Sequence, residues 1–209
     1  MAKLIVSTIG MTLFSPFDLT SEERRIIKSH ANDTHFAPAT RKVVDRLRQK
    51  MLVHPEYLFR AVEFKTLTIY AQKTAQLQHW AMPNVRYVFI ASQTPFGQFM
   101  REMCDRVIRR SYPQLRCEFI SVAGLQVANA AGLDDAMREL TAFLDKLCES
   151  YQRYDVIFNI SGGFKFISGS MQSYANYHGY PTVYSFDGEQ MIMTKPEVPG
   201  QFPPRLVYI

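Results

Sequence analysis

The sequence predicts an α/β fold with a Rossmann-like, doubly wound, mostly parallel sheet that carries helices on both faces. From residue 85 onward, short apolar runs alternate with longer segments of helical periodicity, which is typical of parallel strands joined by crossover helices. A chain of 209 residues with 47% hydrophobic content suits one domain with a full core. We therefore expect residues 1–209 to form a single domain, with a helical segment over 21–80 packed within it and no second domain.

The N-terminal part is predicted to hold one strand and three helices. The strand, Leu4 to Ile9, is apolar and ends at Gly10. Acid-rich or proline-containing starts and apolar periodicity predict the helices. They are expected at Ser21 to Asn32, Pro38 to Met51 and Glu56 to about Gln78.

Strands and helices alternate regularly in the rest of the chain. The expected elements are strands Val85 to Ala91, Cys117 to Val122 and Val156 to Phe158, and helices Gly97 to Arg110, Leu133 to Tyr151 and one that begins at Lys165. Asp187-Gly188 lies between two further apolar runs, Thr182 to Phe186 and Gln190 to Met193, and this pattern predicts a C-terminal β-hairpin. Ligands of parallel sheets bind beyond the carboxyl ends of the strands, so the turns there are candidate sites.

The most informative turn follows the strand Val156 to Phe158. Its candidate ligand-binding residues are Asn159, Ser161, Gly162, Gly163 and Phe164, and Lys165 comes next. Adjacent glycines let backbone amides approach a ligand, and the lysine adds positive charge where a helix dipole is already positive. A phosphate is the expected partner, and the alternative is an ordinary strand-to-helix turn with a solvated lysine. Neither the Walker A spacing nor the G-x-G-x-x-G fingerprint is present.

Two other strand ends and one loop carry similar groups. The candidate residues are Gly10, Met11 and Thr12 after the first strand, Ser92, Gln93, Thr94 and Gly97 after the second, and Gln126 and Asn129 in the loop over 123–132. The Thr12 hydroxyl can bind an anion or simply cap a helix. The loop is expected to close over a ligand, and the alternative is a short static connection.

Composition excludes several classes of function. The net charge of +5 and pI near 9.1 favour anionic ligands, but no run of five basic residues suggests binding to duplex nucleic acid. Three cysteines without a C-x-x-C pair indicate buried thiols of a cytoplasmic protein. No apolar run approaches the ~20 residues of a membrane span, and the five histidines have no metal-ligand spacing. We expect no cofactor and no metal.

Four stretches, in order along the chain, resemble motifs of CRISPR-associated Rossmann fold (CARF) domains. STIGMTLF is similar to their T-x-G-x-S-L turn, and FNISGGFK is similar to their N-x-[ST]-G-G-x-K signature. The run from Val62 to Leu67 resembles the S-A-E-hydrophobic-x-x-L helix of one subgroup, and ASQTPFG resembles its S-D-T-x-x-G turn. The chain departs from the pattern at Thr12, Val62 and Gln93, where the family has serine, a small residue and aspartate.

The resemblance implies a homodimeric sensor of cyclic oligoadenylates, the second messengers of type III CRISPR antiviral defence. A standalone ring nuclease is the preferred hypothesis: it would bind cyclic tetra-adenylate, or cyclic hexa-adenylate, and cleave it slowly to switch the signal off. Attack by a ribose 2′-hydroxyl would need no metal and would leave 2′,3′-cyclic phosphate ends. Lys165 and Thr12 would be the catalytic residues, stabilising the charge on phosphorus oxygens.

Two alternatives remain open at this point. The chain can be a binding-only module that acts through a partner, or an unrelated nucleotide-binding α/β protein. Decay of the ligand in the presence of the protein distinguishes a ring nuclease from a binding-only module. Failure to bind any cyclic oligoadenylate favours an unrelated nucleotide-binding protein.

Overall fold

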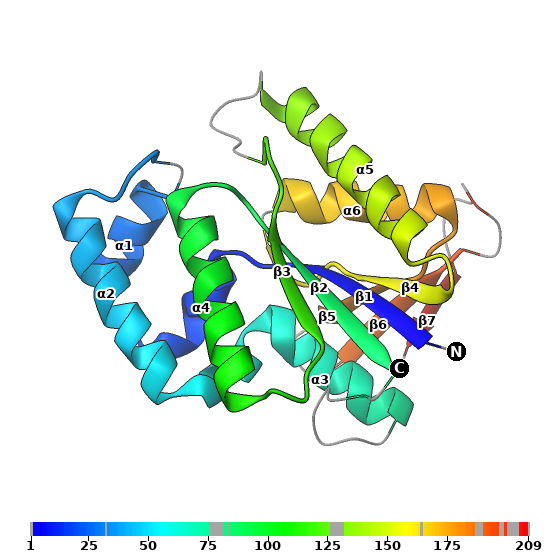
Figure 1. Ribbon diagram of the computed structural model, residues 1–209, viewed down its shortest axis with the longest axis horizontal. Helices are drawn as coiled ribbons and strands as arrows, with labels where there is room; N and C mark the ends of the chain where they lie inside the picture. Colours follow the sequence, from blue (N-terminus) through cyan, green and yellow to red (C-terminus); the bar gives the residue numbers. More distant parts are fainter. Residues whose placement is uncertain are drawn as a thin grey trace.

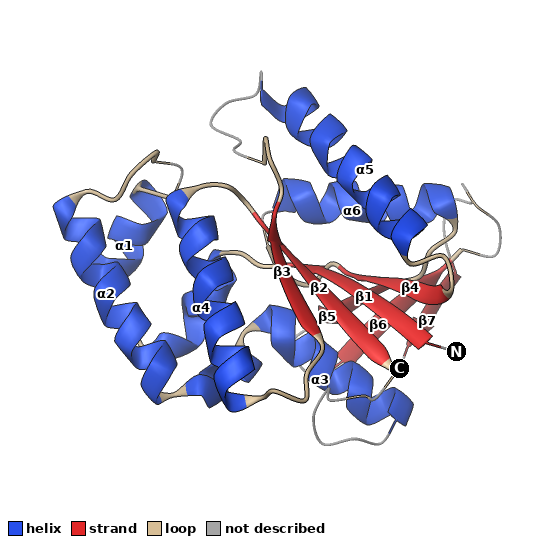
Figure 2. Cartoon of the chain, viewed as in Figure 1, coloured by secondary structure: helices blue, strands red, loops and turns tan. Residues whose placement is uncertain are grey.

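The computed structural model describes residues 2–31, 33–75, 82, 84–125, 132–163, 165–186, 190–196, 199 and 205–208. They form a seven-stranded sheet in the order β3-β2-β1-β4-β5-β6-β7 (Figures 1 and 2). The first five strands in that order are parallel to their neighbours, and β6 and β7 extend the sheet antiparallel beyond β5. The predicted mostly parallel α/β fold and the β5–β6 hairpin pairing are therefore confirmed, whereas Asp187 and Gly188 lie outside the described residues.

The elements have the following bounds. The strands are β1 Ala2–Thr8, β2 Val85–Ala91, β3 Cys117–Ser121, β4 Tyr154–Asn159, β5 Thr182–Phe186, β6 Gln190–Lys195 and β7 Arg205–Tyr208. The α-helices are α1 Ser21–Ser29, α2 Pro38–Val53, α3 Val62–Ala75, α4 Pro95–Ser111, α5 Leu133–Ser150 and α6 Lys165–His178, and two 3₁₀ helices are η1 Met11–Phe17 and η2 Pro55–Arg60.

Helices cover both faces of the sheet, as Figure 2 shows. Successive residues of a strand point to opposite faces, and β1 follows this rule: Ile5 joins the core under η1, α2, α3 and α4, while Leu4 and Val6 join the core under α5 and α6. All three side chains are fully buried. The strand order reverses between β1 and β4, so the ends of these two strands mark the switch point at which such sheets bind ligands.

Two predicted segments before β2 differ from the structure. The continuous helix expected from Glu56 to about Gln78 is wrong, because a 3₁₀ turn, η2, precedes α3 and Ala61 between them is extended (φ −68°, ψ 142°). The turn expected after Gly10 is instead the 3₁₀ helix η1, which three buried side chains, Leu13, Phe14 and Phe17, anchor to the core. The first change matters for the site, because it makes Glu63 part of the first turn of α3.

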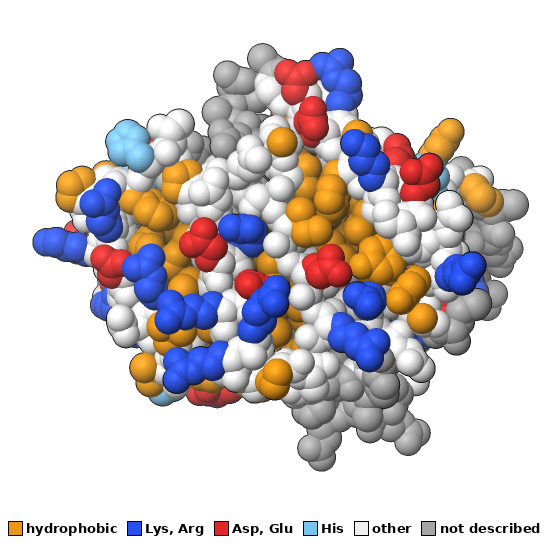
Figure 3. Space-filling model, in the orientation of Figure 1, with side chains coloured by type: hydrophobic (Ala, Val, Ile, Leu, Met, Phe, Trp, Pro, Cys, Tyr) orange, Lys and Arg blue, Asp and Glu red, His pale blue; other side chains and the backbone are white. Residues whose placement is uncertain are grey.

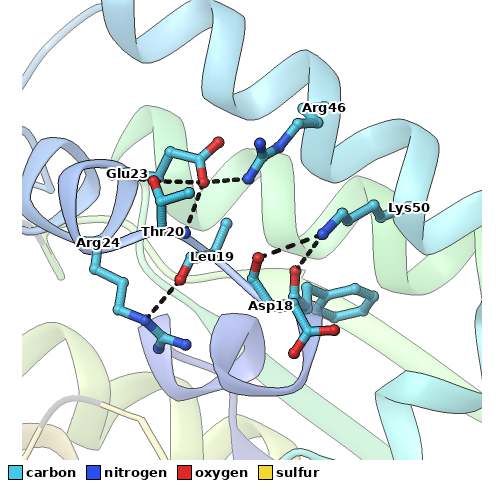
Figure 4. Close-up of polar contacts among 8 residues, drawn as sticks. Asp18, Leu19, Thr20, Glu23, Arg24, Arg46 and Lys50 are labelled. Carbon is cyan, nitrogen blue, oxygen red and sulfur yellow. Dashed lines mark hydrogen bonds and ion pairs between the residues drawn. The ribbon is translucent and has the colours of Figure 1, made fainter.

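Polar contacts from α1 and α2 hold the segment that follows η1 (Figure 4). Thr20 and Glu23 form a reciprocal capping box at the start of α1, and Arg46 of α2 pairs with the Glu23 carboxylate. The Lys50 ammonium donates to the backbone carbonyl of Phe17 at 2.8 Å and to that of Asp18 at 3.4 Å. Such bonds satisfy carbonyls left unpaired at a helix end, so α2 fixes the end of η1, whose start carries Thr12.

The strand at one end of the sheet, β3, packs less completely than the central strands. Its side chains are half-buried or exposed, and Figure 3 shows hydrophobic side chains at the surface in the middle of this view, with Lys and Arg interspersed with Asp and Glu around them. In the part of the chain that the structure describes, no helix is long and apolar enough to cross a membrane.

Candidate functional site

The turns after β1 and β4 meet backbone to backbone. A Cβ atom on Gly10 would lie 2.6 Å from the Cα of Gly163, and one on Gly163 would lie 2.2 Å from Thr8 Oγ1. Gly163 also has a φ of +85°, which residues other than glycine rarely adopt. The Thr8 hydroxyl donates to the Gly162 carbonyl at 2.7 Å. These positions therefore require glycine, and the contact brings the two predicted phosphate-binding turns together.

Glu63 lies beneath this contact, fully buried. Its Oε1 accepts hydrogen bonds from the Gly10 amide, at 3.2 Å, and from the Thr12 hydroxyl. A Cβ atom on Gly162 would lie 2.1 Å from the Glu63 Cγ, so the carboxylate side chain packs directly on the glycine turn. Its Oε2 has no hydrogen-bond partner among the described residues. Glu63 thus joins η1, α3 and the turn after β4.

Burial raises the pKa of the Glu63 carboxyl above its usual range. The hydrogen bond from Thr12, the backbone amide of Glu63 itself, the hydrogen bond from Gly10 and the nearby Gly163 amide act in the opposite direction and offset only part of the effect. Desolvation disfavours the charged form of a carboxyl, whereas donors stabilise it. This acid is therefore easier to protonate than an exposed glutamate.

Asn159, predicted to bind ligand, lies inside the protein beneath the turn. Its amide nitrogen donates to Ser7 Oγ at 3.0 Å and to the Glu63 carbonyl at 2.9 Å, and its oxygen accepts from the Ser161 amide at 3.2 Å. The side chain is fully buried and lines neither of the cavities described next. Its place in the structure fits a role in shaping the turn.

Two cavities lie on either side of the glycine contact. The first has a volume of about 280 Å³ and the second about 520 Å³, and both are lined mainly by apolar surface, although polar side chains are more numerous around the second. The first is lined by Thr8, Ile9, Gly10, Met11, Thr12, Ala31, Ile90, Ser92, Thr94, Phe96, Met100, Leu125, Gly163 and Ile167. The second is lined by Thr12, Ile160, Ser161, Gly162, Gly163, Lys165, Ser168, Gly169, Gln172, Thr182, Tyr184, Ile192 and Thr194. Thr12 and Gly163 line both, so they form a shared wall.

Lys165 is the first residue of α6 and faces the second cavity from an exposed position. Across the described residues, no acidic side chain forms an ion pair with it. A free ammonium at a helix start beside glycine amides suits an anion. The titratable side chains on the two linings are Lys165 and Tyr184.

The turn after β2 contributes to the first cavity through Ser92 and Thr94. Thr94 caps α4 by accepting from the Gly97 amide at 3.1 Å, and its hydroxyl is 2.9 Å from that of Ser92. Gly97 packs on the Ser92 backbone, where a Cβ would lie 2.2 Å from the carbonyl oxygen. Gln93 lines neither cavity, and its carbonyl accepts from the Gln98 side chain.

The sequence prediction brought most of the site together but omitted several residues. From the sequence, Glu63 is recognised only as part of a motif. An acidic residue between the apolar Val62 and Phe64 is nevertheless a sequence signal for a functional carboxyl. Ser168, whose hydroxyl donates to the Gly162 carbonyl at 2.6 Å, gave no signal. Gln126, Asn129 and Phe164 lie outside the described residues.

The structure also changes the role expected for Thr12. Its hydroxyl donates to Glu63, so its hydrogen is not available to a phosphorus oxygen in this arrangement. In the ranges that the structure describes, no group of three His, Cys, Asp or Glu side chains is placed to hold a metal ion.

Comparison with known proteins places these residues in a family. Residues 60–198 match the model of the family "CRISPR-associated protein (Cas_APE2256)". Among solved structures, the chain is similar to Enterococcus italicus Csm6 bound to cyclic hexa-2′-fluoro-hexa-dAMP, with 9% identity and a TM-score of 0.45. That match covers 90% of this chain, which spans about a third, 34%, of the Csm6 chain. A comparison with curated proteins gave no significant match.

Proposed function

Because the chain belongs to the CRISPR-associated Cas_APE2256 family, a family of CARF-containing proteins, we propose that it binds a cyclic oligoadenylate. The observation that carries the proposal is the pair of cavities that share Thr12 and Gly163, with the unpaired Lys165 at the edge of one of them. Phosphates fit the glycine amides and the ammonium. Adenine rings suit the apolar first cavity, because pockets for such ligands are mostly apolar with a few polar groups.

The ligand is cyclic tetra-adenylate in the preferred form of this proposal, and the protein binds it as a homodimer. One chain supplies one Lys165 and one glycine turn, which is little for a ring with four phosphates. A two-fold axis duplicates both and matches the symmetry of the ring. Cyclic hexa-adenylate is the alternative ligand.

We further propose slow cleavage of the ring. A ribose 2′-hydroxyl attacks the adjacent phosphorus, and the products carry 2′,3′-cyclic phosphate. Lys165 and the Gly162 amide stabilise the negative charge that develops on the phosphorus oxygens. The cavity linings offer hydroxyls, amides and one lysine for this chemistry, which is consistent with a route in which the ligand supplies its own nucleophile.

Incubation of the protein with cyclic tetra-adenylate and cyclic hexa-adenylate, in EDTA, tests the proposal. The expected result is conversion of the tetra-adenylate to linear di-adenylate with 2′,3′-cyclic phosphate, identified by mass spectrometry. Products with a 3′-hydroxyl or 5′-phosphate end, or activity lost on chelation, would contradict the cleavage route.

A binding-only function is the second candidate, and one contact favours it. The Thr12 hydroxyl already donates to Glu63, and no carboxylate or imidazole lines either cavity among the described residues. Such a site can hold a messenger without a general base to activate it. Saturable binding of an intact ring that persists for hours would support this candidate over cleavage.

A further inference from the structure

Glu63 has features that a purely structural carboxyl does not need. Among the described residues, it is the only acidic residue in the buried interior. One carboxylate oxygen accepts from Thr12 and Gly10, and the other finds no partner in the part of the chain that the structure describes. An unsatisfied buried carboxyl costs stability, and an apolar side chain of similar volume would avoid that cost. Of the two hydrogen-bond partners of Glu63, Thr12 is the one whose side chain lines both cavities.

We propose that Glu63 is a positioning residue for cleavage of the ring and acts through Thr12, which relays a proton from the ligand's 2′-hydroxyl to the buried carboxylate. This inference rests on the proposed ring-cleaving function. Glu63, behind the wall of the site, would then be the proton acceptor that the described residues of the cavity linings do not provide.

The geometry of Thr12 suits a relay. Its hydroxyl hydrogen is directed at Glu63 Oε1, which leaves the lone pairs of the hydroxyl oxygen free to accept from a ligand hydroxyl. Thr12 is exposed and lines both cavities, whereas Glu63 lines neither. Of the described residues that line the cavities, Thr12 is therefore the one whose side chain connects a ligand to the carboxylate. The Gly10 amide also donates to Oε1, and this second bond fixes the carboxylate against the start of η1.

The proposed step is balanced within the ligand, the two side chains and water. The ligand's 2′-oxygen forms a bond to phosphorus as the bond from phosphorus to the 5′-oxygen breaks. The 2′-hydroxyl proton passes to Thr12 Oγ1 while the Thr12 proton passes to Glu63. The departing 5′-oxygen takes a proton from water. Glu63 returns its proton to solvent through the same hydroxyl after the product leaves.

The electrostatic surroundings make Glu63 a stronger proton acceptor than an exposed carboxylate. Burial raises its pKa, and a general base gains strength as its pKa approaches the working pH. η1 contains no titratable residue. The buried Cys104 thiol of α4 faces Glu63, and burial followed by the Glu63 charge keeps the pKa of that thiol well above its usual range. Over the described residues, no cationic side chain contributes to the Glu63 shift.

A double-mutant cycle with cyclic tetra-adenylate tests the relay. The proteins are wild type, Glu63→Gln, Thr12→Val and the double variant, with Glu56→Gln as the matched control, since Glu56 is an exposed glutamate of the adjacent η2. Each is assayed in EDTA for single-turnover cleavage and for equilibrium binding over the pH range in which it stays folded. Thr12→Ser, which keeps the hydroxyl, is the rescue variant.

The relay predicts that Glu63→Gln and Thr12→Val each lower the single-turnover rate by about a hundredfold or more, with affinity changed by less than about threefold. The double variant should be no slower than the slower single variant, because both changes break one path. The wild-type rate should rise with pH as Glu63 ionises and then level off. Glu63→Gln should lose that rise, while Thr12→Ser and Glu56→Gln keep it.

Other outcomes would overturn the inference. If the two rate losses multiply in the double variant, or if the cleavage rate of Glu63→Gln keeps the pH dependence of the wild type, that result would show that Glu63 only supports the fold. A Glu63→Gln loss confined to affinity would do the same. These results leave ring cleavage by the wild type intact and so refute the relay alone. If the wild type binds the ring and never cleaves it, both the relay and the proposed cleavage fail.

Discussion

At the scale of single residues, Lys165 is the clearest candidate for direct contact with an anion. It is exposed at the start of α6 and lines the larger cavity. The described residues form no ion pair with it, so replacing it removes little from the free protein. Its charge is therefore available to a ligand, unlike that of Arg46 or Lys50, which protein groups already bind.

Lys165→Ala should weaken binding of cyclic tetra-adenylate by about tenfold or more, because a charge-assisted phosphate contact contributes roughly 1.5–3 kcal/mol. Isothermal titration calorimetry measures the change. Lys146→Ala is the control, since this lysine is exposed on α5 and lines neither cavity. Equal affinity in both variants would remove Lys165 from the site.

Glu63→Gln should also change how stability depends on pH. The folded-state pKa of Glu63 is raised above its usual value of 4.5, so the folded protein holds this proton more tightly than the unfolded chain. Its contribution to stability is full below the unfolded pKa and is lost as pH rises through the folded pKa. The stability of Glu63→Gln relative to wild type should therefore increase with pH across that window in urea titrations. Glu149→Gln, which changes an exposed glutamate of α5 that forms no ion pair with the described residues, should show a constant difference.

At the scale of elements, the site depends on turns that leave no room for side chains. Gly162 packs on Glu63, Gly10 packs on Gly163, and Gly163 packs on Thr8. The turns after β1 and β4 and the first turn of α3 thus meet at one place, at the ends of β1 and β4. Gly169 differs from them, because a Cβ there meets nothing within 4 Å.

Gly162→Ala should lower the free energy of unfolding by about 2 kcal/mol or more, because overpacking against Glu63 forces the turn or the carboxylate to move. Gly169→Ala should raise it by about 0.5–1 kcal/mol, since alanine suits a helix interior better than glycine. Chemical denaturation of both variants checks the contrast. Similar stabilities would mean that the turn adapts to a Cβ atom.

At the scale of the whole molecule, each chain carries one candidate site, at the carboxyl ends of the central strands β1 and β4. The described residues provide one Lys165 and one pair of cavities per chain. The proposed ligand has several phosphates arranged symmetrically, so we expect two copies of the chain to surround it.

Light scattering at micromolar concentration should therefore give about twice the chain mass of 24.1 kDa, with or without ligand. The expectation follows from symmetry, because a two-fold axis is the simplest way to place two Lys165 residues around one ring. A monomer mass in both conditions would refute the symmetric site.

The sequence predicted the mostly parallel sheet and the glycine turns at its strand ends well, because strand periodicity and turn glycines are local signals. It placed the start of α6 at Lys165 and the turns of Gly10 and Gly163 at strand ends, as the structure has them. It could not predict the partner of Thr12, since Glu63 lies 51 residues away and reaches it only after α3 packs on the sheet. The break at Ala61 was also missed, because apolar periodicity continues across it.

Among the residues that the structure describes, Thr12 and Gly163 line both cavities and so form the wall between them at one place. A group that fills one cavity and shifts this wall changes the free energy of filling the other. Thermodynamic linkage makes that coupling reciprocal: a nucleoside in the first cavity alters phosphate affinity in the second by the same factor as phosphate alters nucleoside affinity. Titration with fragments of the ring, singly and together, would thus measure the coupling free energy between the two cavities.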